Sequence, residues 1–544
     1  MLPIGKIASQ LGLRESSLEL YGPYIAKIRL STLRKLRGPF RGKLINITAI
    51  NPTPAGEGKT CTAIGLTQAL GRLKKRVALC LREPSLGPLL GVKGGATGSA
   101  RSRVVPSEAI NLHFTGDIHA IGTAHNFLAA CVDNAIVQGN TLGLDPTGES
   151  LRRAMDIPDR QLRHIVSGLG GRGNGVPRES GFDITAASEI MAVMAMAEDL
   201  PDLKARLGRM IVGYTKQGEA VRAASLKIIG AMAVILRDAL QPNLVQTLEG
   251  QPAFVHTGPF ANVSHGNSSV IATKLALRTA DYVITESGFG SDLGSEKLFD
   301  IVCPQAKLKP DAAVIVVSLR ALKSHGGVAL KDVGRADSKA LRTGLANLDR
   351  HLDIVNRFRV PAVVALNRFP QDRAGELRQV LSYVQAKRVP VEMSDVVKRG
   401  GAGGIALARA VLGVLKRTPS RFQPLYEPSV SLRDKIERIA LDVYGADGVR
   451  FDRRAEDQLA HLTRLGFGAL PVNVAKTHLS LSDDPALKGA PTGWFLRVRE
   501  VRVAAGAGFV IALCGKTTFM PGLPREPLAA ELDVTSEGRI VGLS

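Results

Sequence analysis

Cysteines, aromatic residues and long apolar runs are all scarce in this chain of 544 residues. It has five cysteines, at positions 61, 80, 131, 303 and 514, and no two of them form a CxxC pair. Such a set argues against a disulfide framework and a structural zinc site. Apolar runs such as residues 312–319 fall well short of the roughly 18 residues of a membrane-spanning helix. The N-terminus also lacks the pattern of a signal peptide, so we expect a cytoplasmic protein with reduced thiols.

Acidic residues are too few to balance the basic ones. The 71 lysines and arginines exceed the 49 aspartates and glutamates, which gives a formal net charge of +22 at pH 7. Such a charge attracts anions, including nucleotides, phosphates, polyglutamates and nucleic acids. Nucleic-acid-binding proteins usually concentrate their basic residues, whereas here these residues are spread along the chain and aromatic residues make up only 4%. We therefore expect small anionic substrates and no dedicated nucleic-acid site.

Short apolar runs alternate with helical stretches over much of the chain. The expected strands are residues 44–50, 76–81, 254–256, 281–285, 312–319 and 361–366. Residues 58–70 are expected to form the helix after the first strand. This alternation predicts an α/β fold with a doubly wound, mostly parallel sheet. Ligands bind such sheets outside the carboxyl ends of the strands. Polar or glycine-rich segments follow all six strands, at residues 53–60, 82–87, 258–266, 286–290, 323–327 and 367–372.

The last part of the sequence has a different pattern. Residues 494–503 alternate apolar and charged side chains, residues 504–508 are rich in Ala and Gly, and residues 509–513 are apolar again. This pattern predicts an antiparallel hairpin and hence an additional C-terminal α+β lobe. We expect a nucleotide-binding core at residues 1–370, with a helical segment at about 140–240, and C-terminal lobes at residues 371–544.

Residues 51–60 join the first expected strand to its helix and end in the Gly-Lys-Thr of a phosphate-binding loop. Gly56 and Gly58 would let the backbone curl so that its N–H groups face phosphate oxygens, and the helix dipole adds partial positive charge. Lys59 would reach the β- and γ-phosphates, and the Thr60 hydroxyl would contact Mg²⁺. We therefore expect a P-loop-type site for ATP.

The loop departs from the Walker pattern because Thr53 replaces the usual first glycine. The strand before it and the helix after it therefore carry the prediction. The predicted nucleotide contacts are Thr53, Pro54, Ala55, Gly56, Glu57, Gly58, Lys59 and Thr60.

Arg82 and Glu83 follow the neighbouring expected strand. An arginine at such a strand end is able to hold a carboxylate or phosphoryl group with two hydrogen bonds. Glu83 would order that arginine, bind a cation or take a proton. An Arg-Glu pair is most often a surface ion pair, but its place beside the phosphate loop favours a role in binding.

Further polar residues in the strand-end loops are weaker candidates. Asp117, Glu286 and Asp292 are candidate contacts for Mg²⁺ or water, and His265 and His325 lie in predicted loops. A single histidine in a loop is more often a hydrogen-bonding residue than a catalyst. The sequence has neither a Ser-His-Asp order nor a Gly-x-Ser-x-Gly elbow, so a serine hydrolase is not indicated.

Together these segments resemble the formate–tetrahydrofolate ligase family. The matching stretches are TPAGEGKT (53–60), LREPSLGP (81–88), GVKGGATG (91–98), INLHFTGDIHAI (110–121), GNGVPRESGFDIT (173–185), GPFAN (258–262), ESGFGSDLGSEK (286–297), RALKSHGG (320–327) and NRFPQD (367–372). The C-terminal part adds YGADGV, LPVNVAKT, LSDDP, REVRVAAGAGF and MPGLP. The resemblance covers nearly the whole chain.

This resemblance implies a P-loop-related fold, a homotetramer and a response to monovalent cations. The spread of basic residues and the short apolar runs noted above predict no nucleic-acid or membrane partner. It implies the reaction of ATP, formate and tetrahydrofolate to ADP, phosphate and 10-formyltetrahydrofolate through formyl phosphate. Lys59, Thr60 and Mg²⁺ would hold the transferred phosphoryl group, and Arg82 would hold formate. The candidate catalytic residues are Arg82, Lys59, Glu83, Asp117 and His265. The C-terminal lobes would contribute to the folate cleft and to oligomer contacts.

The sequence departs from the family pattern mainly on the folate and formate side. Arg101 replaces a tyrosine that lies by the formate site in the family, and Val397 replaces a tryptophan that stacks on the pterin. Asn367 and Phe369, the latter being the other aromatic partner of the pterin, are retained. Three interpretations follow: a divergent ligase, a paralogue that activates formate for another acceptor, and a nucleotide-binding regulatory or structural protein without ligase activity.

Overall fold

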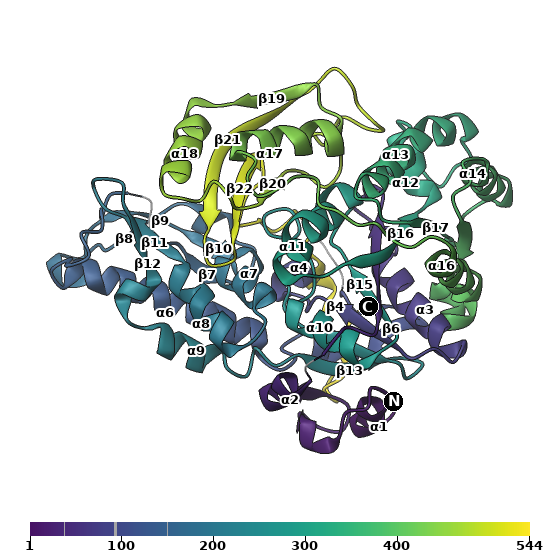
Figure 1. Cartoon of the computed structure of the whole chain (residues 1–544), viewed down its shortest axis with the longest axis horizontal. Helices are drawn as coiled ribbons and strands as arrows, with labels where there is room; N and C mark the ends of the chain where they lie inside the picture. The colour runs from purple at the N-terminus through teal and green to yellow at the C-terminus, as the bar shows by residue number, and fades with distance from the viewer. Residues whose placement is uncertain (37, 92–94, 149–150, 544) are drawn as a thin grey trace.

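The computed structural model describes residues 1–36, 38–91, 95–148 and 151–543. Of the motifs above, residues 92–94 of GVKGGATG lie outside the described residues. A large, mostly parallel β-sheet forms the centre of the molecule (Figure 1). Its parallel strands are, in spatial order, β14 (Pro252–Val255), β4 (Val77–Leu81), β15 (Tyr282–Glu286), β3 (Lys43–Ala49), β16 (Pro310–Val317), β17 (Ala362–Asn367) and β18 (Val391–Ser394).

The six strands expected from the sequence correspond to β3, β4, β14, β15, β16 and β17. The prediction of a mixed α/β fold with a mostly parallel sheet is therefore confirmed. The strands alternate between two apolar layers, since Val314 and Val316 of β16 lie in one core cluster and Ala313, Ile315 and Val317 in another. Burial on both faces explains why these strands form continuous apolar runs.

Additional strands extend the sheet beyond β14. The antiparallel strands are β13 (Asn243–Thr247), β2 (Ala26–Ile28) and β1 (Leu18–Leu20), and β6 (Ser102–Val105) pairs with the end of β13 and with β5 (Gly98–Ser99). Sequence analysis did not predict β13, because polar Asn243 and Gln246 interrupt its apolar pattern. Both side chains are buried and hydrogen-bonded, to Asp117 and to the backbone of Leu2 respectively.

Helices cover both faces of the sheet. One core cluster packs α3 (Lys59–Arg72) and α16 (Ile405–Arg417) on one face, and another packs α10 (Val270–Thr279), α12 (Leu319–His325), α13 (Ser338–Arg357) and α14 (Ala374–Ala386) on the other. The helix expected at residues 58–70 is α3 and is confirmed. The prediction of a strand-end loop at residues 323–327 is wrong, because α12 begins soon after β16 and includes Lys323.

The segment after β6 contains short strand pairs as well as the helices expected there. Its helices are α6 (Asp117–Val137), α7 (Glu189–Met196), α8 (Leu200–Arg209) and α9 (Ile229–Leu236). Its short strand pairs are β7 (Arg153–Met155) with β10 (Phe182–Ile184), β8 (Ile165–Ser167) with β9 (Arg178–Ser180), and β11 (Ile211–Tyr214) with β12 (Ala220–Arg222). The four helices share a separate apolar cluster with β10, β11 and β12, and Figure 1 shows this segment beside the central sheet.

A second sheet lies near the C-terminus, in the order β19 (Gly448–Phe451), β21 (Phe495–Ala504), β22 (Phe509–Cys514) and β20 (Val472–Ala475). It carries α17 (Leu432–Arg438) and α18 (Arg453–Arg464), and Figure 1 shows this unit at one side of the central sheet. β21 and β22 form the expected antiparallel hairpin. The division at residue 370 stays a prediction, and the central sheet itself continues to β18.

The remaining α-helices and β-strands of the described residues are short. They are α1 (Ile4–Gln10), α2 (Leu30–Lys35), α4 (Leu86–Leu90), α5 (Ser107–Asn111), α11 (Cys303–Ala306), α15 (Val396–Arg399), β23 (Asp533–Val534) and β24 (Ile540–Val541). Short 3-10 and π-helical segments also occur, among them the π-helical turns at Ser291–Ser295 and Leu298–Val302. Among the described residues, no helix combines the length and apolar character needed to cross a membrane.

A buried ion pair joins the edge of the central sheet to α6. The Lys27 ammonium lies 2.7 Å from an Asp117 carboxylate oxygen, and the two side chains are 0% and 3% exposed. Lys27 also donates to the Gln241 carbonyl at 3.2 Å, and Asn243 donates to Asp117 at 2.8 Å. These hydrogen bonds compensate the cost of burying both charges.

Replacing Lys27 with Met should lower the free energy of unfolding by about 3–5 kcal/mol, because Asp117 would remain buried without its counter-ion. Urea denaturation of the full chain measures this. The matched control is Lys43→Met, because Lys43 pairs with Asp311 at the surface and is 55% exposed; it should change stability little. Equal stability of the two variants would contradict a structural role for the buried pair.

Candidate active site

The loop between β3 and α3 has the backbone shape that its two glycines predict. Gly56 and Gly58 have φ angles of 72° and 75°, in the left-handed region. A Cβ atom at Gly58 would lie 2.2 Å from Nδ2 of Asn367, which donates to the Glu57 carbonyl at 2.9 Å. Residues 54–56 are exposed, and the first turn of α3 has N–H groups without helical partners. The loop therefore suits an anion.

The Glu57 side chain fixes this loop from inside. One carboxylate oxygen accepts hydrogen bonds from the Thr53 N–H at 2.7 Å and the Thr53 hydroxyl at 2.6 Å. The other accepts from the Ser318 hydroxyl and, at 3.2 Å, from Nε of Arg320. The Glu57 side chain is only 1% exposed. Its carboxylate therefore shapes the loop, and a ligand would meet the backbone at this position.

Lys59 and Arg82 converge on the segment that follows β15. The Lys59 ammonium donates to the carbonyls of Ser287 at 2.5 Å and Phe289 at 2.8 Å, and lies 3.6 Å from the Glu286 carboxylate. Between these carbonyls, a Cβ atom at Gly288 would lie 3.1 and 3.2 Å from the Arg82 guanidinium nitrogens. The sheet order explains this, because β15 lies between β4, which leads to Arg82, and β3, which leads to Lys59.

Positive charge gathers at this point. Burial lowers the pKa of Arg82, and the nearby Glu286 carboxylate opposes that effect. The guanidinium donates to the Pro259 carbonyl at 3.1 Å. An arginine stays protonated even in such surroundings. Lys59 and Arg82 therefore bring two cations to the segment that begins at Glu286, which suits an anionic ligand.

Glu83 and His265 are buried polar groups near Arg82, and burial disfavours the charged form of each. Burial, followed by the charge of Asp117, raises the pKa of Glu83 well above its usual range. Burial, followed by the charge of Arg82, lowers the pKa of His265 to about 3. Glu83 Oε2 and His265 Nε2 have no hydrogen-bond partner among the described residues. Buried polar atoms are rarely left unpaired, so these atoms fit a site that takes a polar ligand.

Asp117 and Asp292 are both engaged in buried ion pairs. Asp117 pairs with Lys27, as described above. Asp292 lies 2.7 Å from the Lys476 ammonium, and both side chains are 0% exposed. Burial alone would raise the pKa of Asp292, but the Lys476 charge, the neighbouring His351 and the hydrogen bonds from Lys476 and Asn51 together outweigh it, and the pKa lies below its usual range. Of the three carboxylates predicted to contact Mg²⁺ or water, only Glu286 lies beside Lys59.

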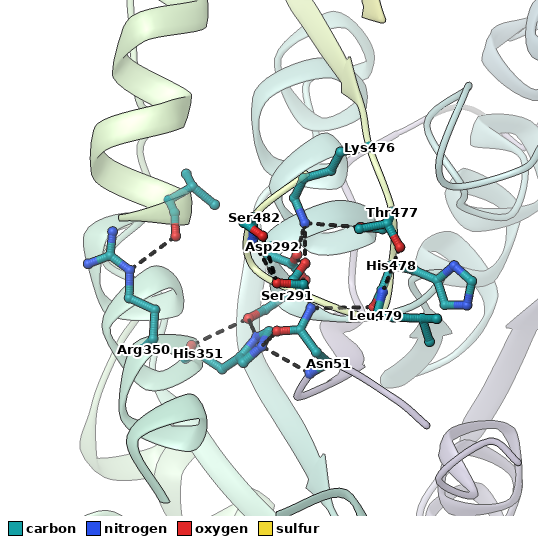
Figure 2. Close-up of polar contacts among 12 residues, drawn as sticks. Asn51, Ser291, Asp292, Arg350, His351, Lys476, Thr477, His478, Leu479 and Ser482 are labelled. Carbon is teal, nitrogen blue, oxygen red and sulfur yellow. Dashed lines mark hydrogen bonds and ion pairs between the residues drawn. The ribbon is translucent and has the colours of Figure 1, made fainter. Parts of the chain in front are cut away.

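A polar network behind the loop was missed by sequence analysis (Figure 2). The Asn51 N–H donates to Nε2 of His351 at 3.0 Å, and the Asn51 side chain donates to Asp292 at 3.1 Å. Nδ1 of His351 lies 2.6 Å from the Ser291 hydroxyl. Burial lowers the pKa of His351 to about 3, so it is neutral and accepts through Nε2. Through Asp292 and Lys476 this network ties the loop to the C-terminal sheet.

The other predicted histidine, His325, has a structural role at the same place. Its Nε2 donates to the Asn51 carbonyl at 2.9 Å, and its Nδ1 accepts from the Gly489 N–H at 3.2 Å. Burial lowers the pKa of His325 to about 4. Two buried, neutral histidines therefore hold the backbone of Asn51, where the phosphate loop begins.

The residues predicted on the folate side come from three places in the chain. Asn367 ends β17 and Phe369 follows it, Val397 lies in α15 after β18, and Arg101 lies in the turn between β5 and β6. The segments after β17 and β18 are neighbours, because the Arg368 N–H donates to the Ser394 carbonyl at 3.0 Å. Phe369 is half-buried, and Arg320 lies 3.9 Å from its ring centroid. The Arg101 N–H donates to the Val397 carbonyl at 3.2 Å. The two departures from the family pattern are therefore in direct contact.

The residues beside the loop fit a Mg²⁺ ion that is held mainly by phosphates. Candidate oxygen ligands beside the loop are the hydroxyl of Thr60, in the first turn of α3, and the Glu286 carboxylate, 3.6 Å from the Lys59 ammonium. Within the ranges that the structure describes, no group of three or more His, Cys, Asp or Glu side chains is arranged to hold a metal. Mg²⁺ commonly binds through one or two protein oxygens, substrate phosphates and water, so such a cage is not needed.

The solved structures that match this chain are too dissimilar to identify its fold. A plasmid partition protein from Borrelia burgdorferi matches 69% of this chain and 99% of its own, with 11% identity and a TM-score of 0.24. A protein from Corynebacterium diphtheriae matches 68% of this chain and 99% of its own, with 13% identity and a TM-score of 0.22.

Comparison with protein sequences is decisive. The family model described as Formate--tetrahydrofolate ligase matches residues 1–544. The Formate--tetrahydrofolate ligase of Symbiobacterium thermophilum is 54% identical over 542 residues, which cover 99% of this chain and 97% of that protein. These two matches show that this chain, which has a phosphate-type loop and two converging cations at the carboxyl edge of its sheet, belongs to the formate–tetrahydrofolate ligase family.

Proposed function

We propose that the chain ligates formate to tetrahydrofolate at the expense of ATP, giving 10-formyltetrahydrofolate, ADP and phosphate. The family match and the 54% identity over nearly the full length support this activity. The structural observation that carries it is the convergence of Lys59 and Arg82 beside Gly288. A carboxylate and a phosphoryl group must meet in this reaction, and two neighbouring cations are suited to holding both.

In the first step, a formate oxygen attacks the γ-phosphorus of ATP, and the bond to the ADP oxygen breaks to give formyl phosphate. Such a transfer needs positioning and charge stabilisation more than covalent chemistry. The N–H groups at the start of α3 would hold the phosphates, as in a P-loop fold, and Lys59 would neutralise the transferred group. Mg²⁺ held by Thr60 and Glu286 would supply further neutralising charge.

Arg82 is suited to holding formate for this attack. Its guanidinium presents paired N–H donors to a carboxylate, in a buried place where such bonds are strong. Burial raises the pKa of Glu83 well above its usual range and lowers the pKa of His265 to about 3, so burial favours the uncharged form of both groups beside formate. Asp117 would act only at a distance, since its charge raises the pKa of Glu83 further while the charge of its partner Lys27 opposes this effect.

In the second step, N10 of tetrahydrofolate attacks the formyl carbon, and phosphate leaves. Phe369 would offer a ring face to the pterin, and Asn367 holds the same loop against Glu57. The absence of a ring at Val397 would cost roughly 0.5–1.5 kcal/mol of stacking beyond the lost burial. Arg101 beside it would attract an anionic part of a substrate. We expect weaker folate binding than with a tryptophan at position 397.

Several expectations accompany this proposal. We propose a P-loop-type core and C-terminal lobes that divide near residue 370, with the lobes contributing to the folate cleft. We further propose a cytoplasmic homotetramer that responds to a monovalent cation. The family resemblance supports these points.

Replacing Arg82 with Ala should reduce formate-dependent ADP formation by about 100-fold or more, because a charge-stabilising donor is lost from a buried site. ADP release with ATP, Mg²⁺, formate and tetrahydrofolate measures this. The matched control is Arg76→Ala at the opposite end of β4, where Arg76 donates to the Thr279 carbonyl. It should retain activity.

The same assay tests the function as a whole when the 10-formyl product is converted by acid to its methenyl form and measured. Formation of this product by the wild-type chain supports the proposal. Formate-dependent ADP without a folate product would indicate another acceptor, and absence of both would indicate a nucleotide-binding protein without ligase activity. Full activity of Arg82→Ala would remove Arg82 from the mechanism.

Replacing Val397 with Trp should lower the KM for tetrahydrofolate about two- to tenfold, because a stacking ring is restored. The KM for formate should not change. Val234→Trp is the control, because Val234 lies on α9 and is 76% exposed. An unchanged KM for tetrahydrofolate in Val397→Trp would contradict stacking at this position.

A further inference from the structure

The side chain of Arg320 connects two parts of the proposed site that differ in function. Arg320 is the second residue of α12, and its side chain is 25% exposed. Its Nε atom lies 3.2 Å from the Glu57 carboxylate, and its guanidinium carbon lies 3.9 Å from the centroid of the Phe369 ring. One planar group therefore contacts both the phosphate loop and the ring proposed to receive the pterin.

At the nucleotide end, Arg320 supports the group that shapes the loop. The Ser318 hydroxyl and Arg320 bind one oxygen of Glu57, while the N–H and hydroxyl of Thr53 bind the other. The Glu57 side chain is almost fully buried. Removing its arginine would leave a buried carboxylate with only neutral donors, which weakens its hold on the loop.

At the folate end, Arg320 covers one face of Phe369. A guanidinium over a ring face is held by a cation–π contact, which is stronger where the groups are partly shielded from water. The Phe369 loop is also tied down by its own N–H, which donates to Asp372 at 2.7 Å. Because Arg320 covers one face of the ring, a stacking ligand would use the opposite face.

We propose that Arg320 is a positioning residue that couples the two subsites, so that a bound nucleotide tightens tetrahydrofolate binding and the reverse. This inference rests on the proposed function. A nucleotide that orders the loop through Glu57 also orders Arg320, and hence the ring on which the pterin stacks. The second ligand then meets a partly ordered site, and coupling of this kind must be reciprocal.

The test uses the full chain with Mg²⁺-ADP and tetrahydrofolate in the absence of formate, so that no turnover occurs. The dissociation constant of each ligand is measured by calorimetry with and without the other. For the wild type we expect each ligand to tighten the other by the same factor, about fivefold or more. In Arg320→Gln this factor should fall to nearly one.

Arg320→Lys serves as a second variant, because it keeps the charge near Glu57 and loses the planar group over Phe369; its coupling should also fall. The control is Arg335→Gln, since Arg335 pairs with Asp332 at the surface and is 83% exposed. It should keep the wild-type factor. A purely structural loss would weaken both ligands and leave the factor unchanged, which would overturn the inference.

The outcomes for the wild type separate this inference from the proposed function. A wild type that binds both ligands without coupling would overturn the role of Arg320 and leave the proposed function standing. Unchanged coupling in both Arg320 variants would do the same. A wild type that does not bind tetrahydrofolate at all would overturn the proposed function, and this inference with it.

Discussion

Two cations held against one short backbone segment are the constraint on which the proposed chemistry depends. The ammonium of Lys59 and the guanidinium of Arg82 reach residues 286–289 from the strands on either side of β15. Their contacts include backbone carbonyl groups and, for Lys59, the carboxylate of Glu286. Two buried cations so close together repel each other, and a bound anion would reduce that repulsion.

The surroundings of this centre hold it in place without adding charge to it. The Glu57 carboxylate is bound by donors of the loop itself. Asp117 and Asp292 each form an ion pair with a lysine. The histidines at positions 325 and 351 are neutral and hold Asn51 by hydrogen bonds. The start of the loop is therefore held by hydrogen bonds to two neutral histidines, and Lys59 and Arg82 bring positive charge to the place where phosphate and formate would meet.

Sequence patterns predicted the elements of the fold well, because strands buried on both faces must be continuously apolar. The same rule failed at β13, where buried Asn243 and Gln246 look like surface residues in the sequence. The loop at Gly56–Thr60 was identifiable because its backbone shape requires glycine at fixed positions. Roles that depend on a partner far away in the sequence were not identifiable. Asp117 pairs with a lysine 90 positions away, and Asp292 pairs with a lysine 184 positions away. Arg320 was also missed, since no local pattern indicates that it stacks on Phe369.

The most direct test is a crystal structure of the full chain with a non-hydrolysable ATP analogue, Mg²⁺ and formate. The account predicts the terminal phosphate against the start of α3, beside the ammonium of Lys59, with formate held between that phosphate and the guanidinium of Arg82. A nucleotide bound elsewhere, or an Arg82 side chain that points away from it, would contradict the account.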